Sequence, residues 1–323
     1  MALPIILLLP LRNILEDRRR TFNHGSGGVL CVAFSPDGST LVSGGQATKL
    51  WDVKTRTLLR TLKQTTFSIV FSPDGETLTG SSYDMGTWLV AKAWDIQSGK
   101  EKANWTIPGT RVAAPERVVL SPDSKKIAVL GVIQDIGKYS GKYSPQIKAE
   151  LRKAHGGVFL RRLPGVPDGQ AAAFSSNSRM LAIGGNSIEI WDIQTGKILS
   201  SFGGGSMTWS LAFSPDGKIL ASGGAGEQSE VRLWDVQTGQ LMHTLVGHLG
   251  PIKPLAFSPD GKLLASGNSL KRYEVRLWDV QTGALQSILT AHKDKINSLA
   301  FSPDGSALAS GSADGTVKLW RIK

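Results

Sequence analysis

The side chains that most often carry catalysis or bind metals are few and scattered in this 323-residue chain. Five histidines and one cysteine, Cys31, form no cluster at the spacing of a metal site. The chain also lacks a G-x-S-x-G nucleophile motif, a phosphate-binding loop and a G-x-G-x-x-G segment that opens a helix. Asp216 and Asp235 could be an acid pair, but each has counterparts in a repeated turn or strand end. We therefore expect no enzymatic activity, no metal and no cofactor.

One stretch has the composition of an anion-binding surface. Residues 137–162 hold seven Lys or Arg residues against one acidic residue, which is net +6 of the +11 that the whole chain carries. Tyr139 and Tyr143 alternate with lysines there, and such rings can stack on bases while cations contact phosphates. The candidate anion-binding residues are Lys138, Tyr139, Lys142, Tyr143, Arg152 and Lys153. The other interpretation, which the sequence leaves open, is a solvated insertion in residues 134–155.

The elements that must position these residues are repeats. The motif Phe-Ser-Pro-Asp-Gly begins at Phe34, Phe71, Phe213, Phe257 and Phe301, with degraded copies at Leu120–Ser124 and Phe174–Ser178. Pro, Asp and Gly in this order are typical of a tight turn, and the apolar segments on both sides predict a β-hairpin. A Trp-Asp pair follows five copies at Trp51, Trp94, Trp191, Trp234 and Trp278, and Trp320-Arg321 follows the last copy. An apolar residue lies 11 positions after each of the first five tryptophans.

Each repeat contains the pattern of four short strands. Residues 211–213 and 218–222 flank one turn, residues 231–234 alternate with period two, and residues 241–245 follow a Thr-Gly turn. The anchor residues from Phe174 onward lie 39, 44 and 44 positions apart. Four strands in about 40–45 residues are typical of one propeller blade. We predict an all-β fold, a seven-bladed β-propeller of four-stranded antiparallel blades.

The two ends of the chain together supply the last blade. The final repeat stops one strand short, and residues 13–22 precede Phe34 by the spacing of a fourth strand. An N-terminal strand that completes the C-terminal blade would close the ring and remove two exposed sheet edges. We therefore expect a single propeller domain over residues 13–323 and an apolar tail, residues 1–12, outside it.

The apolar segment 1–11 has several interpretations. It contains two prolines, is shorter than the ~18 apolar residues of a spanning helix, and lacks the basic start and cleavage site of a secretory signal. It is a surface or disordered tail, the remnant of a longer upstream segment, or a membrane-proximal or targeting segment. A single cysteine is typical of a reducing compartment, so we expect a cytoplasmic protein, with membrane-proximal or exported locations left open.

These motifs resemble the WD40-repeat family over about residues 14–323. In that family a His, a Ser, an Asp and a Trp of one blade can form a hydrogen-bonded tetrad. The seventh blade holds the full set, His292, Ser310, Asp314 and Trp320. His24 and His248 occupy the matching position in the first and sixth blades, which lack the aspartate. The near-identity of the last three repeats is similar to bacterial WD-repeat proteins.

The resemblance implies a non-catalytic scaffold that binds partner proteins or peptides on the top face of the ring, and we expect the ring to be monomeric. Family members tend to present there the residues four and six positions before each anchor. The candidates are Phe67, Glu116, Met207, Trp209, Lys253, Lys295 and Asn297. For Phe67 and Trp209 the alternative is packing in the mouth of the ring. The second functional hypothesis is binding of nucleic acid or acidic lipid through the basic segment of blade 3.

Overall fold

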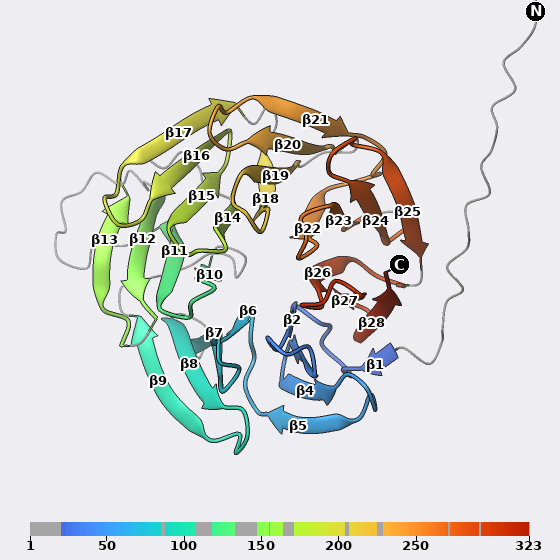
Figure 1. The fold of residues 1–323 in the computed structure, drawn as a ribbon. Coiled ribbons are helices and arrows are strands. Elements are labelled where there is room, and N and C mark those ends of the chain that lie inside the picture. Colours follow the sequence, from blue (N-terminus) through green and yellow to red (C-terminus); the bar gives the residue numbers. More distant parts are fainter. Residues whose placement is uncertain are drawn as a thin grey trace, which may run out of the picture.

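The computed structural model describes residues 21–84, 88–107, 118–132, 147–154, 156–163, 171–203, 207–224, 229–270, 272–290 and 292–322. These residues form 28 strands joined by turns, and no helix occurs among them. None of the described segments is therefore a helix long and apolar enough to cross a membrane. The strands make seven four-stranded antiparallel sheets that follow one another around a ring (Figure 1). The predicted seven-bladed propeller is confirmed.

Each of the first four blades is one continuous stretch of chain, with its strands running from the centre of the ring outward. Blade 1 consists of β2 (Cys31–Phe34), β3 (Thr40–Gly44), β4 (Thr48–Asp52) and β5 (Leu58–Leu62). Blade 2 consists of β6 (Ser68–Phe71), β7 (Thr77–Asp84), β8 (Trp88–Asp95) and β9 (Glu101–Ile107). Blade 3 consists of β10 (Val118–Leu120), β11 (Lys126–Val132), β12 (Ile147–Lys153) and β13 (Phe159–Leu163). Blade 4 consists of β14 (Ala171–Phe174), β15 (Met180–Gly184), β16 (Ser187–Asp192) and β17 (Ile198–Gly203).

Blades 5 and 6 repeat this order, and blade 7 takes its outer strand from the start of the chain. Blade 5 consists of β18 (Thr208–Phe213), β19 (Ile219–Gly224), β20 (Val231–Asp235) and β21 (Leu241–Leu245). Blade 6 consists of β22 (Ile252–Phe257), β23 (Leu263–Asn268), β24 (Glu274–Asp279) and β25 (Leu285–Thr290). Blade 7 consists of β26 (Ile296–Phe301), β27 (Ala307–Ser312), β28 (Thr316–Arg321) and β1 (Thr21–Asn23).

The repeated turn between the first two strands of a blade is closed by its own aspartate. In blade 5, Asp216 accepts hydrogen bonds from the Ser214 hydroxyl (2.6 Å) and from the Lys218 amide (3.0 Å). Gly217 follows with φ of 72°, the left-handed region that glycine enters without steric cost. The hydrogen bonds, first of all that from Ser214, hold the pKa of Asp216 below its usual range. This aspartate is therefore an ionised turn acceptor rather than half of an acid pair.

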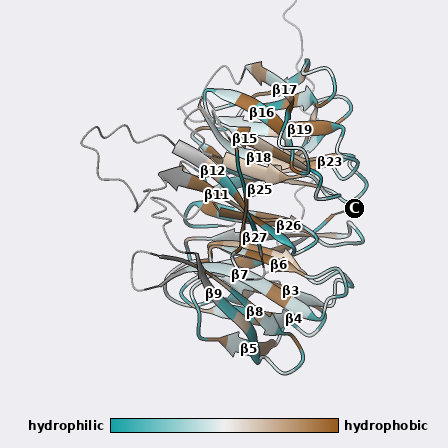
Figure 2. Cartoon of the chain, turned by 90° about the vertical axis from the view of Figure 1, so that its left-hand side faces the viewer, coloured by the Kyte–Doolittle hydropathy of each residue, from teal (hydrophilic) through white to brown (hydrophobic). Residues whose placement is uncertain are grey.

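The hydrophobic core lies between blades rather than inside them. The described residues form seven clusters of buried side chains, one at each junction of neighbouring blades. Leu245 of the outer strand of blade 5, for example, packs with Trp278 of blade 6. Phe202 of blade 4 likewise lies against Trp234 of blade 5, with ring centroids 5.2 Å apart. Where its side chain is described, the apolar residue 11 positions after a tryptophan thus packs against the next blade, and these residues are Leu62, Phe202, Leu245 and Leu289. Figure 2 shows the hydrophobic stretches within the strands and hydrophilic residues in many connecting loops.

The N-terminal strand closes the ring as the spacing of residues 13–22 predicted. β1 pairs antiparallel with β28, with Phe22 opposite Val317. Phe22 is buried against Trp51 of blade 1, with ring centroids 5.5 Å apart. The Val32 amide also donates to the Ser298 hydroxyl (3.0 Å), which joins the inner strands of blades 1 and 7. The expected boundary between tail and domain at residues 12 and 13 lies outside the described residues and stays a prediction.

Candidate functional site at the top face

Three consecutive inner strands carry a β-bulge where they begin. We define the top face as the end of the ring at which the inner strands begin, opposite the Ser-Pro-Asp-Gly turns. The register shifts between Thr208 and Ser210 in β18, across Ile252–Leu255 in β22, and between Ile296 and Ser298 in β26. The residues inside these bulges are Trp209 in β18, Lys253 and Pro254 in β22, and Asn297 in β26. A bulge breaks the alternation of a strand and re-aims a side chain, and bulges are frequent beside functional sites.

Trp209 is the largest side chain that this arc presents to solvent. It is 37% exposed, whereas its neighbours Thr208 and Ser210 are buried. The Lys253 ammonium from blade 6 lies 5.7 Å from the centre of the Trp209 indole, at the distance of a cation–π contact. Met207, two residues earlier in the chain, is 40% exposed. Three of the residues that the sequence predicted to bind a partner, Met207, Trp209 and Lys253, thus lie at the same end of blades 5 and 6.

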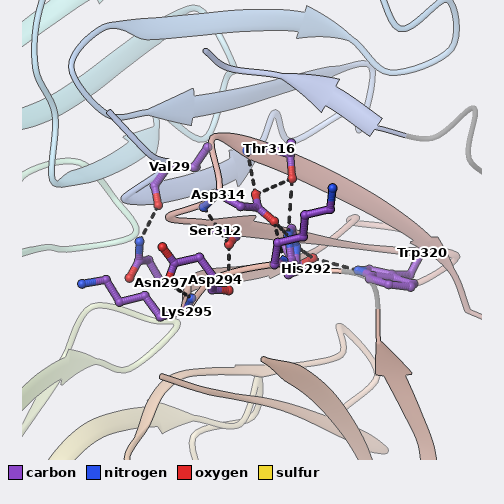
Figure 3. A network of polar contacts seen from close by, with 11 residues as sticks. Val29, His292, Asp294, Lys295, Asn297, Ser312, Asp314, Thr316 and Trp320 are labelled. Carbon is purple, nitrogen blue, oxygen red and sulfur yellow. Dashed lines mark hydrogen bonds and ion pairs between the residues drawn. The ribbon is translucent and has the colours of Figure 1, made fainter. Parts of the chain in front are cut away.

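The predicted top-face residues of blade 7 continue the arc. The Asn297 side-chain amide donates to the Val29 carbonyl of blade 1 at 2.8 Å, so this side chain is fixed across the ring closure. Lys295 is exposed, and its amide donates to the Asp294 carboxylate (2.7 Å) in the turn drawn in Figure 3. Phe67, on the far side of the ring in blade 2, is half-buried directly before β6. Glu116 lies outside the described residues.

The tetrad of blade 7 is a continuous chain of hydrogen bonds (Figure 3). The Trp320 indole N–H donates to the Ser310 hydroxyl at 2.8 Å, and His292 Nε2 lies 2.7 Å from the same hydroxyl. His292 Nδ1 lies 2.9 Å from the Asp314 carboxylate. Burial by itself would raise the pKa of Asp314, but hydrogen bonds from His292 and from the Thr316 hydroxyl hold it well below its usual range. The tetrad connects the third strand β28 to the loop before β26 and so stabilises the position of that loop at the top face.

Two other blades hold shorter versions of this chain. In blade 1, His24 and the Trp51 indole both lie 2.8 Å from the Ser43 hydroxyl. In blade 6, His248 and the Trp278 indole contact the Ser266 hydroxyl at 2.6 and 2.7 Å. Neither histidine has an aspartate partner among the residues that the structure describes. Burial is the main cause that lowers the pKa of His24 to about 4 and that of His248 to about 3.

Blade 3 replaces the tryptophan by an arginine. The bulge that lies at the tryptophan of blades 1, 2, 4, 5 and 6 occurs in blade 3 between Leu151 and Arg152, so Arg152 occupies the tryptophan position. Its guanidinium donates two hydrogen bonds to Glu150, at 2.7 and 3.0 Å, and one to the Gly157 carbonyl. Glu150 is 2% exposed and also accepts from Arg162 at 3.1 Å. The guanidinium of Arg152, a predicted anion-binding residue, therefore already binds the buried carboxylate of Glu150.

Of the other predicted anion-binding residues, the structure describes only Lys153. Lys153 is exposed at the end of β12. Lys138, Tyr139, Lys142 and Tyr143 lie outside the described residues. Since Arg152 and Arg162 both bind Glu150, the described part of blade 3 has fewer available cations than its composition suggests. Binding of nucleic acid or acidic lipid there stays a prediction.

Side chains of the types that bind metals are dispersed over the described residues. These residues contain no cluster of three or more His, Cys, Asp or Glu side chains that could hold a metal ion. Cys31 is buried, and burial raises the pKa of its thiol to about 12. His243, on the outer strand of blade 5, contacts the Gln281 carbonyl of blade 6 at 2.9 Å.

Comparison with known families agrees with this geometry. A family model described as WD domain, G-beta repeat matches residues 16–52, 196–235, 239–279 and 283–321. The chain belongs to the WD40-repeat family. A search of curated proteins gave no match. Each of the four matched segments of this WD40 protein ends one residue after a tryptophan whose indole donates a hydrogen bond to a serine hydroxyl. These serines are Ser43, Ser222, Ser266 and Ser310.

The sequence reasoning missed two features of this WD40 propeller. It did not identify Glu150 as a buried acceptor for two arginines. The repeat pattern could have pointed to Glu150, because it lies two positions before the residue that replaces the tryptophan. In five of the six other blades this position is cationic, and the residues are Lys49, Lys92, Arg232, Arg276 and Lys318. It also missed exposed apolar side chains in top loops, Val246, Leu249 and Leu270, because loop residues follow no periodic pattern.

Proposed function

We propose that this WD40 protein is a non-catalytic interaction scaffold that binds a partner protein or peptide on the top face of blades 5 to 7. The observation that carries the proposal is the series of β-bulges that present Trp209, Lys253 and Asn297 from neighbouring inner strands. Tryptophan is among the residues that contribute most to protein interfaces, and methionine is enriched there. A rigid ring supports the arc, because each inner strand pairs within its own blade and the ring is closed by β1.

The proposal is tested by substituting the central aromatic residue. Trp209→Ala should leave the thermal unfolding midpoint within a few degrees of the wild type, since the side chain is partly exposed. Affinity-tagged full chain is used to isolate partners from a lysate of the source organism, followed by mass spectrometry. We expect partners of the wild type to be depleted at least 10-fold with Trp209→Ala, as for an interface residue worth about 2 kcal/mol.

Leu199→Ala is the matched control. Leu199 is 55% exposed on the outer strand β17, away from the top face, so its loss removes exposed apolar area without touching the arc. This variant should retain the partners. If Trp209→Ala and Phe67→Ala combined retained every partner, the top-face assignment would be wrong.

A further inference from the structure

Exposed apolar side chains are concentrated at one place on the top face. Among the described residues, the large hydrophobic side chains that are exposed fall into two groups. One group lies on or directly before the outer strands β5, β13, β17, β21 and β25. The other group lies at the top of the neighbouring blades 5 and 6 and consists of Met207, Trp209, Val246, Leu249 and Leu270. We call this second group the 5–6 patch.

The members of the 5–6 patch are linked through one short segment. Trp209 is followed by Ser210, whose hydroxyl donates to the Ile252 carbonyl of blade 6 at 3.1 Å. One residue before Ile252, the Pro251 carbonyl accepts a hydrogen bond from the Ser269 amide at 3.0 Å. Ser269 leads directly to Leu270, which is 53% exposed. The patch therefore continues from the inner strand of blade 5 to the loop of blade 6.

The loop that carries Leu270 is held in a defined position. The Asn268 side-chain amide, which is fully buried, donates to the Leu270 carbonyl at 2.8 Å. Leu270 also packs directly over Gly250, where an added Cβ would lie 2.7 Å from the Leu270 Cβ. Apolar side chains on a fixed backbone lose little conformational entropy when a partner binds, so they are suited to receive an apolar anchor.

Cations border this patch. The Lys253 ammonium lies over the Trp209 ring, 5.7 Å from its centre. Arg272 in the same loop as Leu270 is exposed, and so are Lys293 and Lys295 on the next blade.

The acidic side chains that the structure describes near the patch have hydrogen-bond or ion-pair partners, and Glu230, directly before β20, pairs with Arg232 at 3.1 Å. Glu274, which is buried, pairs with Arg276 at 2.6 Å. Asp314 belongs to the tetrad. Asp294 accepts a hydrogen bond from the Lys295 amide. Among the described residues, the exposed charged side chains around the 5–6 patch are therefore predominantly cationic.

We propose that the 5–6 patch binds an acidic peptide segment of a partner protein, with an apolar side chain of that segment against Trp209 and Leu270 and its carboxylates toward Lys253 and its neighbouring cations. The proposal rests on the proposed scaffold function and adds the chemistry of the partner. Complementary charge at the rim of an interface determines which partners bind and how fast they associate. The apolar centre distinguishes such a site from a purely electrostatic surface.

The test uses synthetic peptides with the full chain. Fluorescein-labelled decapeptides share one framework whose core is Glu-Glu-Leu-Glu-Glu, Gln-Gln-Leu-Gln-Gln or Glu-Glu-Gly-Glu-Glu, and binding is followed by fluorescence anisotropy at low and high salt. We expect the first peptide to bind at least 10-fold more tightly than either of the others, with an affinity that falls as salt rises. Equal affinity for all three peptides, or none, overturns the proposal.

Substitutions locate the binding on the patch. Lys253→Glu should weaken the acidic peptide at least 10-fold, and Trp209→Ala should do the same. Lys262→Glu is the matched control, because this exposed lysine lies in the turn at the opposite face and the substitution changes the net charge equally. If Lys262→Glu weakened the peptide as much as Lys253→Glu, the attraction would be general and the proposal would be wrong.

Other anions and the natural partners separate the remaining possibilities. A single-stranded 20-mer DNA or phosphatidylserine vesicles that displaced the acidic peptide at equal charge concentration would show an unspecific anionic surface and overturn the proposal. Natural partners that are lost with Trp209→Ala but retained with Lys253→Glu would leave the scaffold function standing and refute the acidic partner. Partners retained with both variants would refute both proposals.

Discussion

A single serine hydroxyl organises the end of the third strand in four blades of this propeller. Within the described part of the chain, Ser222 accepts a hydrogen bond from the Trp234 indole alone, whereas Ser266 contacts a histidine as well and Ser310 is part of the full tetrad. His24 of blade 1 and His248 of blade 6 are buried, and burial disfavours the charged form of an imidazole. His24 and His248 therefore remain neutral in the folded protein well below pH 6.

The two buried histidines make stability depend on pH. The pKa is about 4 for His24 and about 3 for His248 in the folded protein, against about 6.5 in an unfolded chain. Between these values the unfolded chain binds protons that the folded protein does not. The free energy of unfolding should therefore decrease as the pH falls from about 6.5 toward about 4, with a slope of at most about 1.4 kcal/mol per pH unit for each histidine.

Urea unfolding between pH 4.5 and pH 7.5 measures this slope. His248→Asn should show a smaller decrease than the wild type, because one of the two groups no longer titrates. Leu245→Ala, which is destabilised without losing a titrating group, should keep the wild-type slope. A slope that His24→Asn and His248→Asn both left unchanged would contradict the assignment.

At the scale of secondary-structure elements, blade 3 shows how a strand keeps its place after losing the tryptophan. The pairing of β12 with β13 retains the bulge of the other blades, but the residue at the bulge is Arg152. Its guanidinium lies 5.8 Å from the centre of the Phe159 ring and is fixed by Glu150. A buried ion pair thus occupies the position that an indole and a hydroxyl occupy in blades 5 to 7.

Removal of Glu150 should destabilise the protein strongly. In Glu150→Ala the Arg152 guanidinium loses its carboxylate in a largely buried position, which costs about 3–5 kcal/mol, whereas the more exposed Arg162 can be solvated. Glu101→Ala breaks an exposed ion pair with Lys92 and should cost at most about 1 kcal/mol. Equilibrium urea unfolding compares the two. Equal small losses in both variants would show that the Glu150 network does not stabilise blade 3.

At the scale of the whole molecule, the ring closes where a short N-terminal strand completes the last blade. β1 has three residues, and Phe22 is its one buried side chain. This residue joins blade 7 to Trp51 of blade 1, in the same way as Phe202 joins blade 4 to Trp234 of blade 5. Blade 7 differs from the other blades because its outer strand β1 is not connected along the chain to its third strand β28, and the two are held together by pairing and packing.

Phe22→Ala should weaken this closure. Loss of a buried phenylalanine costs about 3–5 kcal/mol, and both ends of the ring depend on it. Hydrogen exchange measured by mass spectrometry should become faster in β28 and β2 together. Phe202→Ala, the equivalent change at an internal junction, should affect blades 4 and 5 and leave β28 and β2 protected. Unchanged exchange in β2 of the Phe22→Ala variant would contradict this role.

The sequence by itself determined the number of blades, their strands and the closing strand. Turn residues such as Asp216 and Gly217 and the tryptophans act locally or between neighbouring blades, so each repeat contains most of the information for its own geometry. The tetrad of blade 7 was predictable from its four residue types for the same reason.

Only the tertiary structure decided which exposed residues lie together. Trp209 and Lys253 share the repeat position four residues before the anchor, but only the packing of blade 5 beside blade 6 brings the Lys253 ammonium over the indole. Leu270 lies in a loop at the same end of blade 6 and follows no repeated pattern. The structure also decided that Arg152 is bound to Glu150, since composition counts charges without their partners. The pairing of side chains across blades depends on bulges and loop positions, and these are set by packing between repeats rather than within them.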